Sequence, residues 1–192
     1  MSAVPEQFMT LQEYFSFEEA SDVKHEYFHG AIFAMTGASE PHNLIVANLI
    51  GNLHAQLRGK SCRVYPGDLR VKIEATGLYT YPDIQVICGQ PRYADARKDT
   101  VTNPSVIIEV LSPSTEGYDH GVKFQHYRTI ETLQEYLMIA QDTCRVEHYL
   151  RQDTQHWLLV EITRGEQEIA LKAIDGRLSL TDIYEDAGVP TE

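Results

Sequence analysis

One apolar segment, residues 105–111, limits what this chain can fold into. It is apolar at nearly every position and does not alternate with polar residues, which is typical of a strand covered on both faces in the centre of a sheet. Glu109 is the exception within it. An ionised carboxylate buried there costs several kcal/mol unless it is paired, protonated or bound to a cation. The fold must therefore give Glu109 a structural ion pair, a bound cation or a proton.

A second acid, Asp83, stands at the start of another apolar segment, directly after Pro82. Taken alone, Asp83 is also typical of a turn before a strand. Two carboxylates at adjacent strand ends repel each other, and a hard divalent cation with oxygen ligands can hold both in the ionised form. Asp83 and Glu109 together therefore indicate a candidate metal site.

Lys123 is the third candidate. It lies on a helix predicted for residues 116–129, after a turn and cap at 112–115, from which it can lean back over the end of the 105–111 strand. Asp119 lies one turn before it, and by itself this i,i+4 pair would be a surface salt bridge worth a few tenths of a kcal/mol. In company with Asp83 and Glu109, we interpret Lys123 as a site lysine.

The N-terminal part predicts two helices around a hairpin. Residues 10–20 form a short amphipathic helix whose start carries a capping box, and a hairpin follows around a His-Gly pair at 29–30. A longer helix begins at Ser39, a good N-cap, and ends before Gly59. Its apolar residues recur at spacings of three and four, so one face packs on a sheet: Ile45, Val46, Leu49, Ile50, Leu53 and Leu57.

The remaining apolar segments predict strands. Residues 136–140 follow the helix at 116–129, and this strand–helix–strand order implies a parallel crossover. The fold class is therefore α/β, with a mixed β-sheet flanked by helices, in a single domain spanning residues 1–192. The predicted strands are 62–65, 69–73, 81–88, 105–111, 136–140, a hairpin of 145–149 with 157–162, and an edge segment at 169–171.

Charge and cysteine content restrict the partners and the compartment. The net charge of -12 argues against a protein that mainly coats nucleic acid, since that affinity depends on cationic side chains. The three cysteines form no CxxC pair, so we expect free, mostly buried thiols and no zinc site. No apolar stretch is long enough to span a bilayer and the N-terminus lacks signal-peptide features, so we expect a cytoplasmic protein. One group of basic residues can either meet a nucleic-acid backbone or form a solvated surface: Arg58, Lys60, Arg63, Arg70 and Lys72.

These segments together resemble the Uma-two family of restriction-endonuclease-like proteins, within the PD-(D/E)XK nuclease superfamily. The resemblance runs from about residue 10 to 165 and implies a restriction-endonuclease-like core. By that resemblance Asp83 and Glu109 bind Mg²⁺ or Mn²⁺ with the help of the Val110 carbonyl. The motifs that carry it are Pro82-Asp83, Glu109-Val110-Leu111-Ser112-Pro113-Ser114, and Asp119 with Lys123.

The chain departs from the superfamily pattern at one position. The pattern places a lysine two residues after the acid, where this chain has Leu111. Some superfamily members carry that lysine on the neighbouring helix, and Lys123 is interpreted in the same way. Activity depends on this interpretation.

Other polar residues give weaker signals. Glu26 and His42 match positions that the family tends to keep, as a further acid near the metal and as a hydrogen-bonding or phosphate-contacting residue at a helix start. Their alternative interpretations are a strand-edge acid and a core histidine. Asp68 is a secondary candidate, and His120 and His126 are expected at the surface.

The resulting functional hypothesis is a Mg²⁺-dependent DNA endonuclease that hydrolyses phosphodiester bonds. A homodimer is expected, paired through the apolar hairpin residues 157–160. Two alternatives remain open: a catalytically inactive binding or regulatory protein on a nuclease fold, and a phosphodiesterase acting on a small nucleotide.

Overall fold

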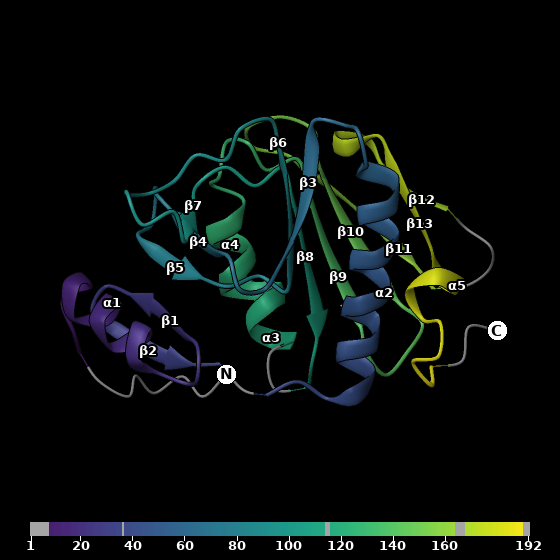
Figure 1. Ribbon diagram of the computed structural model, residues 1–192. Helices are drawn as coiled ribbons and strands as arrows, with labels where there is room; N and C mark the ends of the chain where they lie inside the picture. The colour runs from purple at the N-terminus through teal and green to yellow at the C-terminus, as the bar shows by residue number, and fades with distance from the viewer. Residues whose placement is uncertain (1–7, 36, 114–115, 164–167, 190–192) are drawn as a thin grey trace.

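Buried apolar strands form a six-stranded sheet at the centre of the protein, in the order β11-β10-β9-β8-β6-β3 (Figure 1). The computed structural model describes residues 8–35, 37–113, 116–163 and 168–189. Only β8 and β9 are parallel, and every other neighbouring pair is antiparallel. The strands are β3 (Cys62–Pro66), β6 (Ile84–Cys88), β8 (Val106–Leu111), β9 (Glu135–Ala140), β10 (Val146–Arg151) and β11 (Trp157–Ile162).

Helix α2 (Glu40–Leu57) covers one face of this sheet, as its apolar stripe predicts. The Ser39 side chain accepts a hydrogen bond from the His42 N–H at 3.3 Å, which confirms the predicted N-cap. Successive side chains of β8 point to opposite faces of the sheet, so they pack in two different hydrophobic cores. Ile108 and Val110 pack on the α2 side, whereas Ile107 and Leu111 pack on the opposite side.

The connection from β8 to β9 covers the second face and confirms the predicted parallel crossover. It consists of α3 (Glu116–Tyr118), a π-helical turn (Asp119–Lys123) and α4 (Phe124–Tyr127), in place of one regular helix over 116–129. Such π-turns are rare and are often found at functional sites. The predicted turn at 112–115 lies partly outside the described residues.

A second, five-stranded sheet lies beside the first in the order β2-β1-β5-β4-β7 (Figure 1). The predicted hairpin is confirmed, with positive φ angles at His29 and Gly30 in its turn. Helix α1 (Leu11–Ala20) packs on this sheet through Tyr14 and Phe15. The strands are β1 (His25–Phe28), β2 (Ala31–Ala34), β4 (Arg70–Ile73), β5 (Leu78–Thr80) and β7 (Thr100–Val101).

Two predicted strands need correction. The strand predicted for residues 81–88 begins only at Ile84, as β6, because Tyr81-Pro82-Asp83 connect β5 in the second sheet to β6 in the first. Proline has no N–H to donate to a ladder, so it interrupts the pairing at this point. The segment 169–171 does not join the main sheet. It lies in β12 (Glu168–Leu171), which pairs with β13 (Gly176–Ser179), and α5 (Leu180–Ile183) follows.

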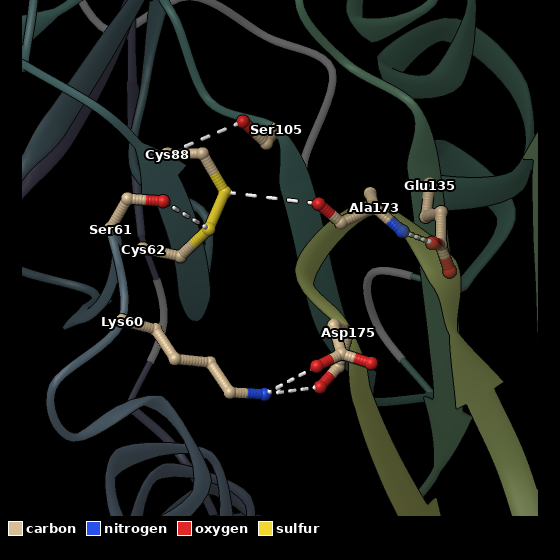
Figure 2. The surroundings of a disulfide bond; sticks show 8 residues. All are labelled: Lys60, Ser61, Cys62, Cys88, Ser105, Glu135, Ala173 and Asp175. Atoms are coloured by element: carbon tan, nitrogen blue, oxygen red, sulfur yellow. Dashed lines mark hydrogen bonds and ion pairs between the residues drawn. A yellow bond between two sulfur atoms is a disulfide. The ribbon is translucent and has the colours of Figure 1, made fainter.

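The prediction of free thiols is wrong for two of the three cysteines. Cys62 and Cys88 form a disulfide, whereas Cys144 is free and half-buried. The antiparallel register of β3 and β6 places Cys62 directly opposite Cys88 (Figure 2). Sequence spacing gives no sign of this register, because strand pairing is decided by the tertiary fold.

None of the helices in the described ranges is both long enough and apolar enough to cross a bilayer.

The capping box of α1 provides a direct test of the local structure. The Glu13 N–H donates to Thr10 Oγ1 at 3.3 Å, and the Thr10 N–H donates to the Glu13 carboxylate at 2.8 Å. We predict that Thr10→Ala lowers the free energy of unfolding by about 1 kcal/mol, the usual loss for an N-cap. Chemical denaturation measures it, with exposed Gln12→Ala as the control that should change stability by less than about 0.5 kcal/mol. Equal losses in the two variants would contradict a capping role.

Candidate active site

The two predicted acids meet at one end of the six-stranded sheet. Since β6 and β8 are antiparallel, the start of β6 lies beside the end of β8, and Ile84 pairs with Ile108. Asp83 and Glu109 are therefore neighbours across the strands. The Asp83 N–H donates to Glu109 Oε2 at 3.3 Å, and the Val110 N–H donates to Asp83 Oδ2 at 2.8 Å.

Lys123 joins the two acids from the π-helical turn. Its Nζ lies 2.8 Å from Glu109 Oε1, 3.4 Å from Asp119 Oδ1 and 3.6 Å from Glu26 Oε1. The residue is only 4% exposed. Burial disfavours the ammonium charge, but Glu109 and the neighbouring groups outweigh this effect and raise the pKa of Lys123 well above its ordinary value. Lys123 is therefore a fixed cation at neutral pH.

The two carboxylate oxygens of Glu109 have different neighbours. Its Oε1 accepts a hydrogen bond from the hydroxyl of buried Tyr127 at 2.8 Å and also pairs with Lys123. Burial, reinforced by the charges of Asp83 and Asp119, raises the pKa of Glu109 to about 8, although Lys123 acts in the opposite direction. The Oε2 atom lies on the Asp83 side and accepts the hydrogen bond from the Asp83 N–H at 3.3 Å.

Glu26, the first secondary candidate, is fully buried beside Lys123. Its carboxylate accepts hydrogen bonds from the hydroxyls of Thr80 and Tyr118, the latter at 2.9 Å. Glu26 comes from β1 in the second sheet, so this acid bridges the two sheets at the site. The interpretation of Glu26 as a strand-edge acid does not describe its position.

His42, the other secondary candidate, reaches the site from the first turn of α2. Its Nε2 lies 3.2 Å from Asp83 Oδ2, and its side chain is 12% exposed. The His42 Nδ1 has no hydrogen-bond partner among the described residues. Hydrogen bonds from Val110 and His42 thus meet at one oxygen of Asp83, which fixes the orientation of this carboxylate.

These side chains line a cavity of about 100 Å³. Four carboxylates and one lysine face it, so negative charge is in excess even with His42 protonated. The volume is sufficient for a cation with a few water molecules. Its lining residues are Glu26, Met35, Gly37, Ala38, His42, Asp83, Glu109, Val110, Ser112, Asp119 and Lys123.

The donors in this cavity suit a hard divalent cation. Asp83 and Glu109 Oε2 supply carboxylate oxygens of the kind that Mg²⁺ and Mn²⁺ prefer. The N–H and C=O of one residue point to the same side of a strand, so the Val110 carbonyl lies on the side of Asp83. Ile84 and Ile108 form the last pair between β6 and β8, so the pairing with β6 does not extend to Val110. The residues therefore fit a metal with two carboxylate ligands and one carbonyl ligand, and its binding stays a prediction.

Three of the weaker sequence candidates lie elsewhere. Asp68 pairs with Lys24, its side chain is 82% exposed, and it does not line the cavity. His120 and His126, expected at the surface, are partly exposed and partly packed against neighbouring residues. His120 Nε2 lies 2.9 Å from Glu147 Oε1 because the crossover packs over β10. The His126 ring packs edge-on against Phe28.

The predicted basic group is not a single surface. Arg70 is 4% exposed and pairs with Asp99 at 3.0 Å, beneath the rings of α1. Arg58, Lys60 and Arg63 lie past the C-terminal end of α2, whereas the acid cluster lies at the N-terminal end. A helix of this length separates its ends by roughly 27 Å. The basic residues are close in sequence but not in space, because the chain between them runs from one end of the sheet to the other.

Sequence reasoning missed three hydroxyl groups that hold the acids: Tyr127, Tyr118 and Thr80. Tyr127 follows Lys123 by four residues, and this spacing on a helix places two side chains on the same face. That signal was present in the sequence. Tyr118 and Thr80 had none, because they meet Glu26 only when the second sheet packs against the crossover.

The fold and the cluster of acids with one buried lysine define a protein of the restriction-endonuclease-like class. The solved structure of a protein from Anabaena variabilis ATCC 29413, described as "a putative nuclease belonging to DUF820", matches with a TM-score of 0.76, covering 93% of this chain and 99% of that chain. The two sequences are 18% identical, so the likeness concerns the fold. The predicted fold class is thereby confirmed.

The family follows from the sequence comparison. The family model Uma2, described as "Putative restriction endonuclease", matches residues 11–181, and the chain belongs to this family. Two proteins of Synechocystis sp. (strain ATCC 27184 / PCC 6803 / Kazusa) are similar along most of their length. The uncharacterized protein sll1609 is 40% identical over 161 residues (84% of this chain and 91% of that protein), and slr1290 is 36% identical over 178 residues (92% and 91%).

Removing the Glu109 charge should stabilise the protein in a pH-dependent way. Because folding raises the pKa of Glu109, the parent chain loses stability as pH rises from the ordinary glutamate range to about 8. Glutamine has no charge to bury, and Lys123 keeps Asp119 and Glu26 as partners. We predict that the melting temperature of Glu109→Gln, relative to the parent, increases by several degrees between about pH 5 and about pH 8 in metal-free buffer.

Thermal unfolding at several pH values checks this, with Glu131→Gln as the control. Glu131 is exposed, so its variant should follow the parent at every pH. A constant offset between Glu109→Gln and the parent would contradict the buried-charge explanation.

Proposed function

We propose that this protein is a divalent-metal-dependent DNA endonuclease, with Asp83, Glu109 and the Val110 carbonyl as the metal-binding groups. The observation that carries the proposal is the position of Lys123, whose Nζ lies 2.8 Å from Glu109 Oε1 although the usual lysine position is Leu111. A lysine brought to this acid from another element restores the charge arrangement of a phosphodiesterase site. The family description "Putative restriction endonuclease" supports DNA as the substrate.

Lys123 acts in this proposal as a cation rather than as a base. Its pKa lies well above the ordinary value, so it has no tendency to take a proton from water at neutral pH. A fixed ammonium can stabilise the negative charge that develops on the phosphoryl oxygens during attack by water. Tyr127 and Asp119 hold Glu109 and Lys123 in position for this task.

The excess of carboxylates makes substrate binding depend on the cation. A phosphodiester approaching Asp83, Glu109, Asp119 and Glu26 is repelled, and Lys123 offsets only part of this charge. When bound, Mg²⁺ or Mn²⁺ supplies Lewis-acid polarisation of the phosphodiester and lowers the pKa of water. The acids of this chain orient the cation, and the first turn of α2 brings His42 to the rim of the same cavity.

A second reading is a non-catalytic binding or regulatory protein on the same fold. Leu111 at the usual lysine position and the net charge of -12 favour it. This protein would keep the acids and the metal but would not cleave DNA. A phosphodiesterase acting on a small nucleotide is the third reading, and cleavage assays on nucleotides and on DNA separate the two.

Metal-dependent cleavage tests the proposal. Purified protein with Mg²⁺ or Mn²⁺ should cleave plasmid or oligonucleotide DNA, and Asp83→Ala or Glu109→Ala should abolish cleavage because each removes a metal-binding carboxylate. Lys123→Ala should lower the rate by about 100-fold, because the variant loses the cation that stabilises the developing charge. Mn²⁺ should still raise the melting temperature of this variant, because the metal-binding groups remain. Asp68→Ala, which removes an exposed carboxylate outside the cavity, is the matched control and should keep full activity.

Two results would overturn the proposal in different ways. Mn²⁺ that raises the melting temperature without supporting cleavage of any DNA form would favour the binding protein. No effect of Mn²⁺ on either stability or cleavage would remove the metal site itself.

We also propose that two copies pair through β11. This strand lies at the edge of the six-stranded sheet and leaves Leu158, Leu159 and Val160 exposed by 50%, 47% and 39%. A two-fold contact between edge strands would cover these residues and give a dimer with two sites. Light scattering at micromolar concentration should give a dimer, and Leu159→Glu should give a monomer, whereas a monomeric parent chain would contradict the pairing.

A further inference from the structure

The Cys62–Cys88 disulfide lies at the end of the sheet remote from the acid cluster. Cys88 is the last residue of β6, whereas Asp83 directly precedes the first. Figure 2 shows the disulfide, with Ser61 beside Cys62 and the Ala173 carbonyl beside Cys88. This position makes the sulfurs independent of the candidate active site.

A cationic pocket of about 390 Å³ opens beside one of the two sulfur-bearing residues. Cys62 lines this pocket and Cys88 does not. None of the described residues that line it is a carboxylate, but Lys60 pairs with Asp175 outside the lining at 3.0 Å, so Arg58 and Arg63 supply the charge that this pair leaves uncompensated. The lining is His54, Leu57, Arg58, Gly59, Lys60, Cys62, Arg63, Val64 and Tyr65.

The neighbours of the sulfurs suit two free thiols as well as a disulfide. The Ser61 hydroxyl lies 4.0 Å from Cys62 Sγ, where it can donate to a thiolate. The Ala173 carbonyl lies 3.9 Å from Cys88 Sγ, where it can accept from a thiol S–H. This carbonyl is fixed, because the Ala173 N–H donates to Glu135 Oε1 at 2.6 Å. The disulfide has no S–H, so the Ala173 contact becomes a hydrogen bond only after reduction.

We propose that Cys62–Cys88 is a thiol–disulfide exchange site whose reductant is an anionic low-molecular-weight thiol. The pocket attracts the anion and brings it to Cys62, which lines the pocket although only 7% of the residue is exposed. Cationic surroundings favour the thiolate form of a cysteine, which is the reactive form. Cys88 is the resolving thiol, with Ala173 as its acceptor.

The exchange balances in two steps. The thiolate of the reductant attacks Cys62 Sγ, a mixed disulfide forms, the Cys62–Cys88 bond breaks, and Cys88 leaves as a thiolate that takes up a proton. A second molecule of the reductant then attacks the sulfur of the first. This releases Cys62 as a thiolate and the reductant as its own disulfide, so that two electrons enter the protein.

Glutathione serves as the anionic probe and dithiothreitol as the neutral one. The oxidised, folded chain should react with iodoacetamide at Cys144 alone, and after reduction without denaturant also at Cys62, several-fold faster than at Cys88. In Cys88→Ser, oxidised glutathione should form a mixed disulfide at Cys62, located by peptide mass. A disulfide that opens only in denaturant, or faster labelling of Cys88, would overturn the proposal.

Charge reversal in the pocket tests the choice of reductant. Arg63→Glu should slow reduction by glutathione several-fold and leave reduction by dithiothreitol unchanged, because only the first reductant is anionic. Arg128→Glu reverses an exposed charge that does not line this pocket, and it should change neither rate. Equal slowing with both reductants, or none with glutathione, would show that the pocket does not select an anionic thiol.

Discussion

The contact between Lys123 and Glu109 is the interaction on which the rest of this structure depends. A carboxylate in the central strand of a sheet is tolerated only if its charge is compensated, and here the nearest cation is 2.8 Å away. The compensation is incomplete, because Asp83, Asp119 and Glu26 lie around the same ammonium or its partner. The protein therefore keeps a concentration of negative charge that its own lysine does not neutralise. Such a surplus suits a site that takes up a cation.

Topology brings this cluster together from five separate parts of the chain. An antiparallel pair places Asp83 beside Glu109, and the parallel crossover returns over the sheet and carries Lys123 to the same end. The second sheet contributes Glu26, and the first turn of α2 contributes His42. Each residue is held by its element or by a hydroxyl group, so the cavity is formed before any ligand binds. The unusual position of the lysine follows from the π-helical turn, which points both Asp119 and Lys123 inward.

Local patterns were sufficient where short-range forces decide the outcome. The capping box of α1, the N-cap at Ser39 and the apolar stripe of α2 are all as the sequence predicts, since each depends on residues a few positions apart. Sequence patterns gave wrong predictions where contacts between distant segments decide the structure. The strand expected at 81–88 begins only at residue 84, because residues 81–83 cross between the two sheets. Arg70 is buried under α1, and strand register pairs Cys62 with Cys88.

The sequence by itself determined that Glu109 must be buried and either compensated or protonated, because an ionised carboxylate in an apolar strand is costly without a partner. It also indicated Asp83 and Lys123, from an acid at a strand start and a lysine on the following helix. Only the tertiary structure decided which oxygen of Glu109 faces Asp83, since Tyr127 and Lys123 both contact Oε1 and the Asp83 N–H donates to Oε2. Only the tertiary structure buried Glu26, and it alone paired the cysteines. The physical reason is that burial and charge pattern are recorded along the chain, whereas the direction of a side chain depends on the elements packed against it.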